Sequence, residues 1–192
     1  VDLSTVPDSD AAFAASIAGK PVVLAYATSA GEPEPDKLII KSGFAQVGAP
    51  ALSAVPTIGR ITSNLPILNA AATGLGGINI DLAGEQGIAR QIPLLWGDGT
   101  RFAPTLSVEA LRVAQGVDTL LVNSSPDTDN ALESVRIGEI DIPTSESGMF
   151  YVHYRPNPRD LYVSAVDVLN VEKHSNIRPL IEGNIVYVGT SA

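Results

Sequence analysis

The sequence predicts an α/β fold with a mixed, partly parallel central sheet, flanking helices and an antiparallel hairpin region. Residues 8–19 indicate a helix that ends at Gly19, with Asp8, Ser9 or Asp10 as its N-terminal cap. The apolar run "PVVLAYAT" (21–28) then predicts a strand buried on both faces. A second helix, over 103–116, ends at Gly116 and is followed by the predicted strand 117–123. Helices that alternate with buried strands are typical of α/β domains.

The remaining elements follow from periodicity and turn residues. Residues 37–66 are dense in Pro, Ser and Gly and predict an irregular connection with little regular structure. On the helix 103–116 the apolar residues on one side are Leu106, Ala110, Leu111 and Val113. The other expected elements are a helix over 66–77 that ends in glycines, a hairpin of strands 78–80 and 88–96 around the turn 81–87, a tight turn at 97–99, paired strands over 133–145 and 149–155, a brief helix over 164–170 and a buried strand over 184–192.

Composition limits the classes of function. The chain has 192 residues, of which 45% are hydrophobic and 17% charged, and this predicts one globular domain over 1–192. A formal net charge of -9 repels phosphate backbones, so nucleic acid is excluded as an expected partner. The absence of cysteine excludes disulfides, thiolate nucleophiles and thiolate zinc sites. No run of 18 apolar residues is present, and no leader precedes Val1, which suggests an excised piece of a longer protein.

Catalytic and cofactor motifs are missing from the sequence. The glycines of "GLGGIN" (74–79) follow a helix rather than a strand, so they do not form a phosphate-binding loop. No G-x-S-x-G elbow occurs, and His153 and His174 lack the spacing of a metal pair. The loop "PDTDN" (126–130) lacks the glycine and glutamate of a calcium loop. No catalytic residue, metal or cofactor is therefore expected.

Four residues are candidates for holding a small ligand: Arg90, Trp96, Tyr154 and Arg155. An arginine can bind a carboxylate with two hydrogen bonds, and an aromatic neighbour supplies a stacking face. The structural alternative is that Arg90 pairs with Asp81 or Glu85 and that Trp96 covers the sheet. A third reading, a small hydrolase or sugar-processing enzyme, has Asp81, Glu85 or Asp141 as acid or base.

Taken in order, six stretches resemble the second type of CHASE domain, the sensory extracellular domain associated with cyclases and histidine kinases. They are "DSDAAFAASIAGKPVVLA" (8–25), "GGINIDLAGEQGIARQIPLL" (76–95), "APTLSVEALRVAQG" (103–116), "IPTSESGMFYVHYR" (142–155), "SAVDVL" (164–169) and "NIVYVGTSA" (184–192). The shared order covers nearly the whole chain.

The resemblance implies a catalytically silent sensor on the outer side of a bacterial cytoplasmic membrane. It implies membrane anchoring in the full-length protein, with an adenylate or guanylate cyclase as the leading output and a histidine or Ser/Thr kinase as the alternative. The signal is an unidentified small molecule or protein, and a homodimer is expected to help switching. A protein-interaction module remains a further alternative.

Three departures from the family pattern stand out. The chain begins after the family's first strand and helix unit and stops before the segment that leads into the membrane, which implies trimming at both ends and a missing edge strand. The segment "RPNPRD" (155–160) replaces a glycine that often follows the Tyr-Arg pair. Ligand contacts are therefore not carried over to that loop.

Overall fold

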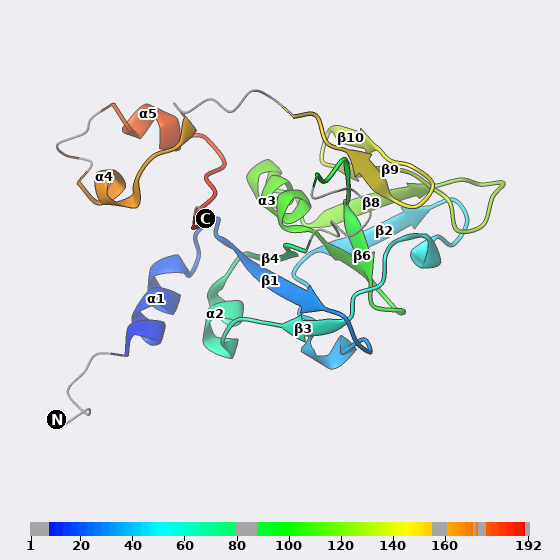
Figure 1. Cartoon of the computed structure of the whole chain (residues 1–192), viewed down its shortest axis with the longest axis horizontal. Helices are drawn as coiled ribbons and strands as arrows, with labels where there is room; N and C mark the ends of the chain where they lie inside the picture. The colour runs from blue at the N-terminus through cyan, green and yellow to red at the C-terminus, as the bar shows by residue number, and fades with distance from the viewer. Residues whose placement is uncertain (1–7, 80–87, 155–160, 171, 173–175, 191–192) are drawn as a thin grey trace. The chain divides into compact units, whose positions relative to one another are not determined.

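The computed structural model describes residues 8–79, 88–154, 161–170, 172 and 176–190 (Figure 1). The chain divides into two compact units, residues 1–152 and 153–192. The helices are α1 (Ser9–Ile17), α2 (Pro66–Ala71), α3 (Leu106–Gln115), α4 (Ala165–Leu169) and α5 (Arg178–Ile181), with 3-10 turns η2 (Pro35–Lys37) and η3 (Leu52–Ala54). The strands are β1 (Val23–Ser29), β2 (Gly43–Val47), β3 (Arg60–Thr62), β4 (Gly74–Gly77), β5 (Gln91–Pro93), β6 (Leu95–Gly97), β7 (Phe102–Pro104), β8 (Thr119–Ser124), β9 (Leu132–Ile137), β10 (Ile140–Pro143) and β11 (Met149–Tyr151).

The first unit has a three-stranded sheet in the order β3-β1-β4 and a four-stranded sheet in the order β10-β9-β8-β2 (Figure 1). The pairs β1·β4 and β2·β8 are parallel, whereas β1·β3, β8·β9 and β9·β10 are antiparallel. Two short antiparallel pairs, β5·β11 and β6·β7, complete the strands. The predicted mixed α/β class is confirmed.

Two hydrophobic clusters hold the first unit together. The first cluster includes Leu95, Phe102, Leu120 and Val135, and the second includes Tyr26, Leu75, Trp96 and Ala103. Adjacent residues of the β6·β7 pair thus contribute to different clusters, since Leu95 and Phe102 point to one side and Trp96 and Ala103 to the other. This hairpin lies between the two cores.

Local signals placed the main helices correctly. Asp8 caps α1, because its Oδ1 accepts hydrogen bonds from the backbone N–H groups of Asp10 and Ala11 at 3.0 and 3.1 Å. Helix α3 ends at Gly116, which has the left-handed φ of 64° that glycine adopts without strain. The strand over 117–123, the turn at 97–99 and the brief helix over 164–170 are confirmed as β8, the β6·β7 turn and α4.

The buried face of α3 differs from the predicted one. Leu106, Ala110, Leu111 and Val113 are only half-buried. The residues that the fold buries almost completely are Val108, Glu109 and Arg112. The predicted face left out Val108, and apolar periodicity could not indicate that Glu109 and Arg112 are buried as an ion pair.

Several predicted pairings are wrong. The predicted hairpin of 78–80 with 88–96 is wrong, because residues 78 and 79, the described part of its first strand, are not in a strand. The strands nearest the turn 81–87 have other partners: β4 pairs with β1, β5 with β11, and β6 with β7. The turn itself lies outside the described residues. Strand β11 therefore does not pair with 133–145, which forms its own β9·β10 hairpin.

Two segments have a different secondary structure from the expected one. The glycines at 74–77 form strand β4 rather than a helix stop, and the connection 37–66 contains strands β2 and β3. The end of the chain was predicted as a buried strand. In its described part, 184–190, no strand is present, and Val188 is 96% exposed.

The second unit is small and displays much apolar surface. It contains α4 and α5, and among its described residues Ile177 is buried at 5% exposure. Its exposed large apolar residues include Leu161, Tyr162, Val166, Leu169, Val186 and Tyr187. Among the described residues, no helix is long and apolar enough to cross a bilayer.

Candidate functional site

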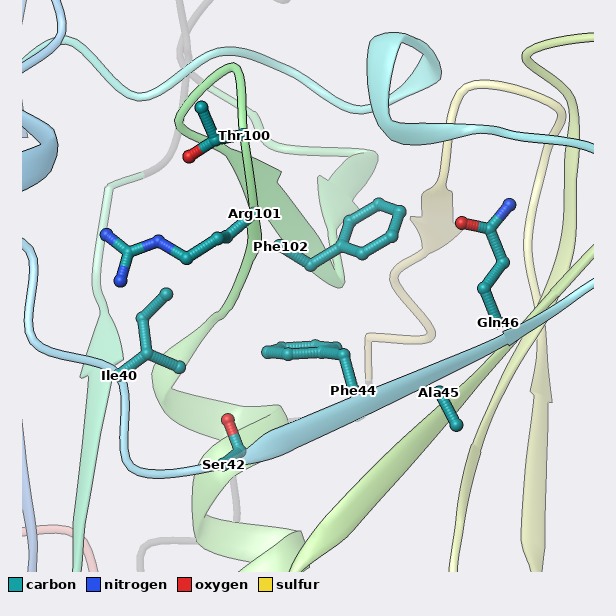
Figure 2. A pocket seen from close by; sticks show the side chains of 8 residues that line it. All are labelled: Ile40, Ser42, Phe44, Ala45, Gln46, Thr100, Arg101 and Phe102. Atoms are coloured by element: carbon teal, nitrogen blue, oxygen red, sulfur yellow. The ribbon is translucent and has the colours of Figure 1, made fainter.

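A groove of about 460 Å³ lies in the first unit between β2 and the start of β7. It is lined by Ile40, Ser42, Phe44, Ala45, Gln46, Thr100, Arg101 and Phe102 (Figure 2). Its volume falls in the range of about 300–1,000 Å³ that small-molecule sites occupy. We therefore take this groove as the candidate site.

Strand geometry explains how the groove wall forms. Successive side chains of a strand point to opposite faces, so every second residue shares a face. Figure 2 shows Ile40, Ser42, Phe44 and Gln46 directed into the groove from β2 and the segment before it, whereas Ala45 points the other way. The period of two continues through Gln46, which lies at one end of the groove.

Two aromatic rings form the apolar part of the site. The ring centroids of Phe44 and Phe102 are 5.8 Å apart, and the ring planes are tilted by 41°. Such tilted pairs are favourable contacts of aromatic rings. Both side chains also pack against the first hydrophobic cluster, so the rings are anchored to the core.

Ser42 supplies an unsatisfied hydrogen-bonding group. The residue is 9% exposed, and its Oγ has no hydrogen-bond partner in the part of the chain that the structure describes. A buried hydroxyl without a partner costs free energy, which a bound water or ligand recovers. Figure 2 shows this oxygen directed into the groove.

Arg101 is the charged residue of the lining, and Asp98 holds it in place. The Arg101 Nε and Nη2 atoms donate to Asp98 Oδ2 at 3.0 and 2.9 Å, and Nη2 also donates to the Pro35 carbonyl at 3.1 Å. Burial alone would raise the pKa of Asp98, but hydrogen bonds from Thr100 and Arg101 outweigh it and hold this pKa below its ordinary value. Because the guanidinium charge is already paired, the groove is close to neutral.

None of the four predicted ligand residues lines this groove. Trp96 is a core residue, 8% exposed, and packs in the second cluster. Arg90 is exposed just before β5, where its carbonyl accepts a hydrogen bond from Val152 N at 2.9 Å. Tyr154 is 66% exposed and belongs to the second unit, and Arg155 lies outside the described residues. Their role in binding stays a prediction.

Of the three predicted acid and base candidates, only Asp141 lies among the described residues. Asp141 is exposed on β10, where its Oδ1 accepts a hydrogen bond from Ser134 Oγ at 2.7 Å and lies 4.0 Å from Arg136 Nε. Asp81 and Glu85 lie outside the described residues. Among the residues that the structure does describe, no group of three or more His, Cys, Asp and Glu side chains could hold a metal ion.

Sequence reasoning missed the groove because residues 37–66 looked irregular. Ser42, Gly43 and Gly48 weaken the strand signal around "GFAQV". The available signal was the alternation of Ile40, Ser42, Phe44 and Gln46, which places these four side chains on one face. The opposite wall, Thr100–Phe102, is more than 50 residues away along the chain, so only the fold brings it near.

The second cluster also contains buried polar atoms without partners among the described residues, Tyr26 Oη and Trp96 Nε1. Burial, and secondarily the charge of Glu109, raises the pKa of Tyr26 well above its ordinary value. The Tyr26 ring lies against Gly77 of β4, where an added Cβ would meet it at 3.3 Å. Tyr26 is therefore a neutral core residue.

The family model of the CHASE2 domain matches residues 1–192, the whole chain. No curated protein and no solved structure matches this chain.

Proposed function

The chain belongs to the CHASE2 domain family, and from this membership we propose that it is the signal-input domain of a bacterial membrane receptor, binding a ligand in the β2–β7 groove. CHASE2 domains are sensory, generally extracytoplasmic, and not known as catalytic. The leading output module in this proposal is an adenylate or guanylate cyclase, and a histidine or Ser/Thr kinase is the alternative.

The observation that carries the proposal is the groove with its unpartnered Ser42 hydroxyl beside two aromatic rings. Ligand sites are concave and mostly apolar, with a few placed polar groups. In this groove Ile40, Phe44 and Phe102 supply the apolar part, and Ser42, Gln46, Thr100 and Arg101 supply the polar groups. The predicted binding residues Arg90, Trp96, Tyr154 and Arg155 remain a second candidate set.

A ligand acts on such a receptor through its difference in affinity for two conformations. Moving the output from about 1:99 to 99:1 requires a difference of about 5.5 kcal/mol. In a dimer two ligands bind, and each contributes part of this free-energy difference. This is why we expect the receptor to act as a homodimer anchored in the membrane.

A ligand screen tests the proposal. At a concentration 100 times its Kd, a ligand stabilises the folded domain by about 2.7 kcal/mol, which raises the melting temperature of a domain of this size by about 5–10 °C. We expect such a shift from at least one compound of a broad metabolite and peptide library. Filling the groove end with Gln46→Tyr should abolish the shift.

The matched control is Glu133→Tyr, which places the same side chain at an exposed position of β9 outside the groove. It should bind as the unmodified domain does. A shift that survives Gln46→Tyr but disappears in variants of Arg90 and Tyr154 would move the site to the second candidate set. No shift from any compound would contradict the ligand-sensing proposal.

A further inference from the structure

Strand β2 forms an edge of the four-stranded sheet, since the order is β10-β9-β8-β2. Its parallel register with β8 pairs Phe44 with Leu120, and Gly43 N donates to the Asp118 carbonyl at 2.8 Å. In a parallel pair, alternate residues direct their N–H and C=O groups to the partner strand. Gly43, Ala45 and Val47 therefore face β8, and the backbone groups of Phe44 and Gln46 face outward.

The outward backbone groups of β2 lack the protection seen at other edges. Natural proteins blunt open edges with charged residues, proline or covering side chains. Strand β10 carries Asp141 and Pro143, and β3 is covered where Glu34 Oε2 accepts the Ile61 N–H at 3.1 Å. Strand β2 has the sequence "GFAQV", with neither a charge nor a proline.

The groove runs beside this open edge. Ile40, Ser42, Phe44 and Gln46 form one wall, and Thr100–Phe102 form the other (Figure 2). An incoming strand must fit between the two walls. A single extended segment does so, whereas the edge of a folded sheet brings its neighbouring strands with it.

The chemistry of the groove matches a peptide better than a strongly anionic ligand. The Arg101 charge is paired with Asp98, so an anion meets no uncompensated cation there. Within the described part of the chain, the groove groups for which no hydrogen-bond partner is found are Ser42 Oγ and the outward N–H and C=O groups of β2. Peptide amides complement such groups, and an apolar side chain fits against Phe44 and Phe102.

We infer that the β2 groove binds a soluble, uncharged extended peptide, which adds as a strand to the outer edge of β2. The peptide exchanges hydrogen bonds with the backbone of Phe44 and Gln46 and places an apolar side chain against the two phenyl rings. It accepts a hydrogen bond from the Ser42 hydroxyl once the side chains that cover the Ser42 Oγ atom in the free domain have shifted. This inference rests on the proposed sensory function, for which it names the class of signal.

Proline at position 46 tests the strand pairing directly. Gln46→Pro removes an N–H that faces outward, so it spares the backbone hydrogen bonds to β8, and proline is tolerated on edge strands for this reason. It also removes the hydrogen bonds that Gln46 Nε2 donates to Ser124 Oγ and to the Ala49 carbonyl. Gln46→Ala is the matched control, because it removes the same side chain but keeps the N–H. The probe is a pooled library of uncharged pentapeptides blocked at both ends, followed by the best single binder.

We expect Gln46→Ala to bind that pentapeptide within about threefold of the unmodified domain, and Gln46→Pro to bind it at least tenfold more weakly. Both variants should keep the far-UV circular dichroism spectrum of the domain. Equal binding by the two variants would overturn strand addition.

Ser42→Ala provides a test that does not depend on proline being accommodated. Since the hydroxyl has no partner among the residues that the structure describes, its removal should not lower the melting temperature, yet it should weaken peptide binding about fivefold. A lower melting temperature with unchanged binding would mean that the hydroxyl serves the fold rather than the peptide.

Amide hydrogen exchange reads the pairing residue by residue. In the free domain the Phe44 and Gln46 amides should exchange faster than those of Ala45 and Val47, and pentapeptide binding should slow them. If metabolites raise the melting temperature while no pentapeptide protects these two amides, the peptide assignment fails and the sensory proposal stands. Protection that appears on raising the protein concentration alone would make a second copy the occupant and overturn the inference.

Discussion

At the scale of single residues, Glu109 and Arg112 form a buried ion pair inside the first unit. Glu109 is 0% and Arg112 4% exposed, and Arg112 donates from Nε to Glu109 Oε2 and from Nη2 to Glu109 Oε1, both at 2.8 Å. Arg112 Nη1 also donates to the Val117 carbonyl at 2.7 Å. The hydrogen bonds to Glu109 raise the pKa of Arg112, so the guanidinium remains charged in the core.

Replacing Glu109 by glutamine should therefore be costly. Glu109→Gln leaves the Arg112 charge buried without a counter-charge, and such a change destabilises proteins by about 3–5 kcal/mol. Urea unfolding measures the loss, with Glu133→Gln at an exposed position as the control, which should change stability by less than about 0.5 kcal/mol. A similar small effect at both sites would show that the core tolerates the unpaired arginine.

The ionisation of Asp98 makes the stability of the domain depend on pH. Its Oδ1 accepts hydrogen bonds from Thr100 N, Thr100 Oγ1 and Arg101 N at 2.7–2.8 Å, which together favour the ionised form. The pKa of Asp98 in the folded state lies below its unfolded value of about 3.9. The ionised carboxylate therefore stabilises the fold fully at pH values above about 3.9. This stabilisation is lost as the pH falls through the folded-state pKa.

Asp98→Asn should thus be less stable than the unmodified domain by about 2 kcal/mol at pH 7. The difference should shrink as the pH falls below about 4, because the unmodified carboxyl then becomes protonated and neutral. Urea titrations at pH 7, 5 and 3 measure it. Thr100→Ala retains the carboxylate and the main-chain donors, so its stability should keep the steep loss in acid. If the free energies of unfolding of the unmodified domain and of Asp98→Asn changed equally with pH, this account would be contradicted.

At the scale of elements, strand β4 is built almost entirely of glycine because α3 lies directly on it (Figure 1). A Cβ on Gly76 would stand 2.5 Å from Leu106 Cα and 2.7 Å from Leu106 N. A Cβ on Gly74 would stand 2.7 Å from Glu109 Oε1. The absent side chains let the helix approach the strand and bring Glu109 to its buried position.

Gly76→Ala should consequently force α3 away from β4. Because the clash is with backbone atoms that no rotamer change can move, we expect a loss of about 3 kcal/mol or more. Gly189→Ala is the control, since no atom lies within 4 Å of its added Cβ. Thermal unfolding compares the two variants, and equal melting temperatures would show that the contact between α3 and β4 yields easily.

At the scale of the whole molecule, both hydrophobic clusters consist of residues from the first unit. The groove also belongs to that unit, between the open edge of β2 and the β6·β7 hairpin. The same hairpin carries Trp96 and Ala103 into the second cluster and Leu95 and Phe102 into the first. A ligand that moves Phe102 therefore acts on an element shared by both cores, which gives the proposed sensor a route from binding to a change of conformation.

Local sequence signals were enough to predict helices α1 and α3. The Asp8 cap and the Gly116 stop depend on hydrogen bonds and dihedral angles within a few residues, so they can be predicted without knowing the fold. The order of motifs across the chain was enough to indicate the CHASE2 family, which the whole-chain match confirms.

Only the tertiary structure decided the strand pairings, the buried face of α3 and the candidate site. Gly76 looked like a helix stop because its reason for being glycine, Leu106, is thirty positions further along the chain. Phe44 pairs with Leu120, and Ser42 faces a wall formed by Thr100–Phe102. Caps and periodicity reflect neighbours in sequence, whereas an open edge and a groove depend on which distant segments pack together, and no local pattern records that choice.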